Sequence, residues 1–98
     1  MGQLVLNQYI GLPATYEQLA EEAIELAHAA LKLARIYRGE NPCPSEPNQA
    51  SLKVVEEFTD LMIIADDLGL KPSGLVKSKK IHRMRERIAE DIVGRSEK

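Results

Sequence analysis

The chain has 98 residues, enough for one domain or for part of a domain shared with a partner chain. Its 13 basic and 15 acidic side chains give a net charge of −2, and 44% of its residues are hydrophobic, a content that excludes a disordered chain. The longest uncharged apolar run after the N-terminus is too short to cross a membrane, no basic secretory start is visible, and Cys43 is the only cysteine, so we expect a cytoplasmic protein.

The N-terminal part of the chain predicts an arm followed by a long helix. Residues 1–13 are apolar, and their pattern leaves open whether they form an extended arm or a short helical turn. The first long helix is predicted over about residues 15–38. Thr15 and Gln18 have the spacing of a capping box, and Gly39 is a typical residue after a helix end.

Two further long helices follow, each bounded by residues that break helices. A segment with three prolines separates the first helix from the second, which is predicted over about residues 48–69. The third is predicted over about residues 74–93 and should end at Gly94. Because no stretch alternates like a strand, the sequence predicts a single all-α domain over residues 1–98.

The apolar residues of the helices cover wide faces at helical spacing. Three helices with such faces cannot easily cover one another within one chain, so we expect a helical bundle completed by homo-oligomerisation. The apolar positions are Leu19, Ala23, Leu26, Ala30, Ala34 and Tyr37 in the first helix, Val54, Val55, Phe58, Leu61, Met62, Ala65 and Leu68 in the second, and Ile81, Met84, Ile88 and Ile92 in the third.

Two pairs of carboxylates border the apolar faces of the first two helices. The first helix carries an EExxE pattern, Glu21-Glu22-x-x-Glu25, and the second carries an ExxD pattern, Glu57-x-x-Asp60. Residues three apart share a helix face, and both pairs lie at similar heights in an antiparallel hairpin, so we expect the carboxylates to converge. Converging carboxylates repel one another unless cations neutralise them or some become protonated. Oxygen ligands without cysteine favour Mg²⁺, with Mn²⁺ as the alternative.

A row of basic residues on the third helix complements these acids. Lys80, Arg83 and Arg87 fall within about 60° of one another on a helix. Residues 17–70 have a net charge of −7, whereas residues 71–98 have a net charge of +5. The basic row is suited to bind a polyphosphate. An acidic chain without an aromatic platform is not expected to bind nucleic acid.

The order of these motifs resembles a known family. EEAIEL, a proline-containing loop, EEFTDLMIIADDLG and KKIHRMRERI resemble the MazG-like all-α nucleoside triphosphate pyrophosphohydrolases over about residues 16–90. The resemblance implies Mg²⁺-dependent hydrolysis of a nucleoside triphosphate between its α and β phosphates, yielding the monophosphate and pyrophosphate. It also implies removal of unwanted nucleotides, and dimers or tetramers with sites near the subunit interface. The implied metal ligands are Glu22, Glu25, Glu57 and Asp60, and the implied phosphate-binding positions are Lys80 and Arg83. Either Glu21 or Glu22 is the expected proton acceptor for the attacking water.

Two other interpretations remain open. In a non-catalytic helical adaptor dimer, the acids would pair with bases, and Lys53 lies one turn before Glu57 for that purpose. In a di-iron carboxylate protein, Glu25 and His28 would form an ExxH motif, and a second copy of the chain would supply the other one. Asp67 is expected to be either a solvated acid or an outer contact of the metal or substrate.

Overall fold

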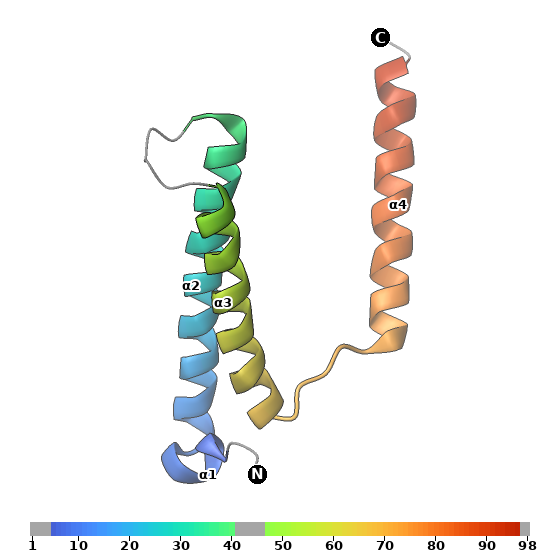
Figure 1. Ribbon diagram of the computed structural model, residues 1–98. Coiled ribbons are helices and arrows are strands. Elements are labelled where there is room, and N and C mark those ends of the chain that lie inside the picture. The colour runs from blue at the N-terminus through green and yellow to red at the C-terminus, as the bar shows by residue number, and fades with distance from the viewer. Residues whose placement is uncertain (1–4, 41–46, 97–98) are drawn as a thin grey trace.

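The structure is a computed structural model that describes residues 5–40 and 47–96. Within these residues the regular secondary structure is all helical, as predicted, and consists of one short and three long helices. Figure 1 shows the two central helices side by side as a hairpin, with the short helix at one end and the last helix standing apart. The helices are α1 (Leu6–Ile10), α2 (Leu12–Arg38), α3 (Pro47–Asp67) and α4 (Gly74–Ser96).

The start of α2 differs from the prediction. The helix begins at Leu12, directly after Gly11, and no side chain caps it. Thr15 lies inside the first turns and donates its hydroxyl hydrogen bond to the Gly11 carbonyl at 2.8 Å, while the Gln18 amide donates to Glu22 at 2.9 Å. The predicted capping box is therefore wrong. Pro13 explains the earlier start, because proline fits the first turn of a helix, where its missing N–H costs nothing.

The helix ends follow the glycines in two cases out of three. Gly39 adopts a left-handed conformation with φ of 71° and terminates α2 as predicted. The second long helix ends at Asp67, two residues before its expected end, and Gly69 follows with φ of 72°. The prediction for Gly94 is wrong, since α4 continues through this residue to Ser96. The proline-rich loop with Cys43 lies outside the described residues at positions 41–46.

The N-terminal arm contains helix α1, which the side chain of Asp67, at the end of α3, holds in place. The Asp67 carboxylate accepts hydrogen bonds from the backbone N–H groups of Leu6 and Asn7, both at 2.9 Å. The Asn7 side-chain amide donates to the same carboxylate at 3.0 Å and to the Asp67 carbonyl at 2.8 Å. The first N–H groups of a helix have no partner within the helix, and here Asp67 satisfies two of them. The arm is thereby attached to the end of α3.

The core between α2 and α3 is thin. The buried apolar residues are Ala29, Ala50 and Ile64, and the polar side chains of Thr15 and Glu57 are also buried. Small residues at the contact allow the two helices to approach closely. Larger apolar side chains of the predicted wide faces, such as Tyr37, Phe58 and Met84, are more than half exposed to solvent. A single chain does not cover these faces, and their burial in an oligomer stays a prediction.

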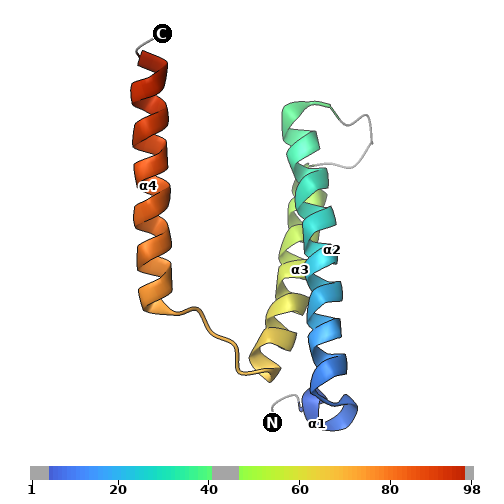
Figure 2. The same cartoon turned by 180° about the vertical axis from the view of Figure 1, so that it is seen from behind.

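Helix α4 stands apart from the other described helices. No Cα atom of α4 lies within 8 Å of another described helix, and the reverse view in Figure 2 shows the same separation. A turn at residues 68–69 and a segment without regular structure at residues 70–73 connect it to the hairpin. Across the described residues, no helix combines the length and the apolar character needed to span a membrane.

Candidate metal and phosphate site

Three acidic side chains from the two central helices converge in the hairpin. Glu22 comes from α2, and Glu57 and Asp60 come from α3. Each offers one carboxylate oxygen, and these three oxygens all lie within 4.8 Å of one another. Glu57 is buried, whereas Glu22 and Asp60 are half-buried. The antiparallel hairpin therefore brings together three of the four predicted ligands, and we refer to them as the carboxylate cluster.

Neighbours one turn away hold two members of the carboxylate cluster. Glu22 accepts the hydrogen bond from Gln18, which lies four residues earlier on α2. Glu57 accepts a 2.8 Å contact from the Lys53 ammonium, which lies four residues earlier on α3. Spacings of three and four residues place side chains next to each other on a helix, so the sequence specifies both contacts locally. No buried side-chain polar atom among the described residues lacks a hydrogen-bond partner.

Lys53 introduces a positive charge beside the cluster. The hydrogen bond to Glu57 and the nearby charge of Glu56, at 3.6 Å, raise the pKa of Lys53 above its ordinary value of 10.5. Lys53 is therefore charged at neutral pH, when it partly neutralises the cluster. The ion pair between Lys53 and Glu57 is the one expected for the adaptor interpretation, and it does not exclude a second cation.

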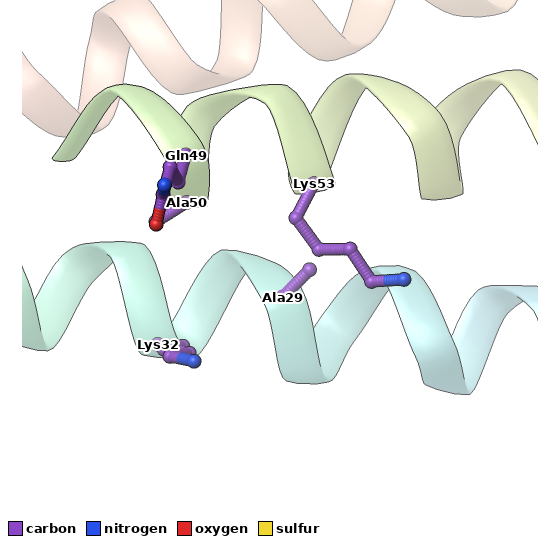
Figure 3. A pocket seen from close by; sticks show the side chains of 5 residues that line it. All are labelled: Ala29, Lys32, Gln49, Ala50 and Lys53. Carbon is purple, nitrogen blue, oxygen red and sulfur yellow. The ribbon is translucent and has the colours of Figure 1, made fainter. Parts of the chain in front are cut away.

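A small hollow lies between α2 and α3 next to the cluster. Its lining residues are Ala29, Lys32, Gln49, Ala50 and Lys53. Figure 3 shows that the Lys53 side chain leaves α3 and extends along the gap toward α2, with its nitrogen at the far end. Two ammonium groups and one amide next to small alanines give the hollow polar donors around a narrow apolar floor. Groups of this kind are suited to phosphate or carboxylate oxygens.

The remaining residues of the EExxE motif lie outside the carboxylate cluster. Glu21 and Glu25 are exposed on α2, and so is His28 of the alternative ExxH motif. Glu25 lies one turn after Glu22, on a neighbouring part of the same helix. The roles of Glu21 as proton acceptor and of Glu25 as metal ligand stay predictions, as does the di-iron interpretation.

The predicted basic row is present on α4 but is separate from the acids. Lys80, Arg83 and Arg87 are exposed, and together with Met84 they line a shallow surface hollow. Their helical spacing gives the expected common face. Because α4 contacts no other described helix, a single chain does not bring this row to the carboxylate cluster.

The cluster has the composition that a hard divalent cation requires. Three carboxylate oxygens from two rigid helices match the ligands that Mg²⁺ and Mn²⁺ take in proteins. Two oxygens that share one Mg²⁺, each about 2.1 Å from it, lie at most about 4.2 Å apart. The cluster oxygens, all within 4.8 Å of one another, would need only a small side-chain movement to close on one ion. Acidic groups of this kind also occur without a metal, so the geometry fits an ion without requiring one.

Sequence reasoning missed the role of Asp67. Helical spacing places Asp67 seven residues after Asp60, on nearly the same side of α3, and the sequence predicted either a solvated acid or an outer contact of the metal or substrate. Its carboxylate instead binds the start of α1. The local pattern carries no signal for this contact, because the two partners are 60 and 61 residues apart. Comparisons of the chain with protein-family models, curated proteins and solved structures found no match.

Proposed function

We propose that the protein is a Mg²⁺-dependent nucleoside triphosphate pyrophosphohydrolase that cleaves between the α and β phosphates, with Mn²⁺ as an alternative ion. The observation that carries the proposal is the convergence of Glu22, Glu57 and Asp60 from two antiparallel helices within 4.8 Å. The resemblance of the motif order to the MazG-like family adds the reaction and the substrate class. Removal of unwanted nucleotides from the cellular pool is the role that this reaction would serve.

In this proposal the carboxylate cluster holds the metal, with Glu25 joining from the next turn of α2. When bound, the ion supplies positive charge that offsets the carboxylates and the triphosphate. Glu57 is the anchor, because it is buried and fixed by its neighbours. Binding a divalent ion would compete with Lys53 for the Glu57 carboxylate, so the Lys53 ammonium would become free to contact a phosphate oxygen.

The chemical step requires a proton acceptor and positive charge at the leaving group. The oxygen of a water molecule attacks the α phosphorus, and the bond between this phosphorus and the oxygen that bridges to the β phosphate breaks. The proton from the water passes to Glu21 or Glu22. Pyrophosphate leaves with the bond electrons. Lys80, Arg83 and Arg87 would stabilise the charge that develops on the phosphate oxygens. Since α4 does not reach the cluster within one chain, we include a homodimer or tetramer in the proposal.

The deciding experiment measures pyrophosphate release from a panel of nucleoside triphosphates with Mg²⁺. Glu57→Gln should lower turnover by at least about 100-fold, because it removes the charge of the buried ligand and keeps its shape. Glu56→Gln is the matched control, since Glu56 is the exposed neighbour that also pairs with Lys53. Equal activity of the two variants would remove the cluster from the reaction, and the absence of pyrophosphate release with every nucleotide would end the proposal.

The adaptor interpretation remains the second candidate because of the Lys53 contact. An ammonium group 2.8 Å from Glu57 neutralises part of the cluster without any metal. The large exposed apolar side chains would in that case serve a partner protein. Thermal melting with and without Mg²⁺ separates the two functions, since a metal site is stabilised by mass action and an ion-paired surface is not.

A further inference from the structure

Helix α4 presents an apolar stripe that nothing in the chain covers. Met84, Ile88 and Ile92 are 59–60% exposed, and Ile81 continues the stripe one turn earlier. Their spacing of three and four residues places them on one side of the helix. An isolated helix depends on packing of its apolar side for most of its stability. A partner for this stripe is therefore needed for α4 to be stable in solution.

A second apolar face lies on the hairpin. Val55, Phe58 and Met62 of α3 follow the same spacing and are 60%, 51% and 42% exposed. Asp60 lies about 160° from Phe58 around the helix. A helix that covered the Val55–Phe58–Met62 face would therefore leave the carboxylate cluster open to solvent and to a ligand. The basic row of that docked helix would not face the same cluster, so its proposed phosphate contact requires a further subunit contact, as in a tetramer.

The single chain exposes more surface than a compact monomer of its mass. Its accessible surface is 8092 Å², whereas a compact monomer of 10.9 kDa exposes about 5,600 Å². Its radius of gyration is 18.3 Å, against about 13 Å for a compact domain of 98 residues. The excess is about 2,500 Å² per chain, or about 5,000 Å² for two chains, which is the upper end of the roughly 2,000–5,000 Å² in total that obligate dimers bury.

Charge favours contact between α4 and a hairpin of the same sequence. Helix α4 carries seven basic and three acidic side chains, whereas α2 and α3 together carry four basic and nine acidic ones. The two units thus have net charges of +4 and −5. Opposite net charges accelerate association and disfavour contacts of like with like, such as α4 against α4.

The connecting segment favours a hairpin from another copy over the hairpin of the same chain. Residues 70–73 have no regular secondary structure and include Pro72, and the residue before a proline, here Lys71, favours extended over helical conformations. Packed helices lie only 8–10 Å apart, so packing α4 on its own α3 would require a tight turn in this segment. Figure 1 shows the segment leading away from the hairpin before α4 begins.

We propose that α4 is an exchange arm, a helix that packs on another copy of the chain and not on its own. In the dimer, the Met84–Ile88–Ile92 stripe of each chain docks on the Val55–Phe58–Met62 face of the other. The inference rests on the oligomer included in the proposed function but not on its chemistry. Its test measures molecular mass, whereas the test of the proposed function measures pyrophosphate release. Failure of one proposal is therefore distinguishable from failure of the other.

The first experiment measures the mass of the full chain by light scattering over a concentration series. The wild type should have at least twice the monomer mass of 10.9 kDa. Ile88→Asp should raise the dimer dissociation constant by at least about 100-fold, because it places a charge in the apolar contact. Val93→Asp is the matched control, since Val93 is 54% exposed and lies outside the stripe. A monomeric wild type, or equal effects of the two variants, would overturn the proposal.

The second experiment separates exchange from packing within one chain. Phe58→Asp damages the hairpin face, and Ile63→Asp, at a residue that is 48% exposed on another side of α3, is its control. Ile88→Asp and Phe58→Asp homodimers each lose both docked arms, whereas a mixed dimer keeps one intact arm on one intact face. Mixing the two variants should therefore recover the dimer at concentrations where each alone is monomeric. Failure to recover it, with helicity by circular dichroism unchanged, would show that α4 packs in its own chain or not at all.

Discussion

Asp60→Asn should stabilise the protein in the absence of divalent metal and should remove its stabilisation by Mg²⁺. At the limiting separation of 4.8 Å, two carboxylates repel by about 3 kcal/mol at an effective dielectric constant of 20, and the substitution removes two of the three repulsive pairs in the cluster. Glu22 and Asp60 are half-buried, so solvent screens much of this repulsion, and we expect a net gain of about 1 kcal/mol. For a domain of this size the gain raises Tm by about 4–8 °C.

The response to metal has the opposite sign. At a Mg²⁺ concentration of about 100 times Kd, binding stabilises the wild type by about 2.7 kcal/mol, and Asp60→Asn should lose most of this increase. Melting is followed by circular dichroism in EDTA and in Mg²⁺ at one fixed protein concentration, since assembly also affects Tm. Asp66→Asn, at an exposed acid outside the cluster, should behave like the wild type. The reasoning would be refuted if Mg²⁺ left the Tm of the wild type unchanged and the Asp60→Asn variant had a lower Tm than the wild type in EDTA.

Three further predictions concern the attachment of α1, the glycines and the basic row. Asp67→Ala should abolish hydrogen-exchange protection of the Leu6 and Asn7 amides while the hairpin stays protected, because it removes their acceptor; retained protection would contradict this role. Gly39→Ala should destabilise by about 1 kcal/mol because φ is 71°, whereas Gly94→Ala, inside α4, should not destabilise, as measured by urea unfolding. Arg83→Ala should lower kcat/KM for the triphosphate by about 10-fold, and an unchanged value would leave Arg83 a solvated surface residue.

The features that local spacing determines could be predicted from the sequence. The contact between Lys53 and Glu57 is an example, since residues four apart on one helix meet wherever that helix packs. The end of α2 at Gly39 is another, because only glycine readily adopts the left-handed conformation found there. The antiparallel arrangement of α2 and α3 then brings Glu22 to the level of Glu57, which is most of the carboxylate cluster.

The features that depend on distant partners or on competing local signals could not be predicted. Thr15 has the pattern of a cap, but Pro13 allows the helix to begin one turn earlier. Gly94 ends a helix only when the following residues stop it, and here α4 continues past it. The position of α4 relative to the hairpin could not be predicted from the sequence either. An apolar stripe indicates that a helix face is buried, but it does not indicate which chain buries it.

Asp67 has a consequence for reading acidic residues along α3. Glu57, Asp60 and Asp67 look like one periodic series of acids, yet the last belongs to a different task, in which the length of its side chain is critical. A glutamate at position 67 would keep the charge, but its extra methylene would push the carboxylate out of register with the two amides that it grips. At position 67 an Asp→Glu substitution thus tests the attachment of α1, whereas at position 60 the same substitution tests the proposed metal site.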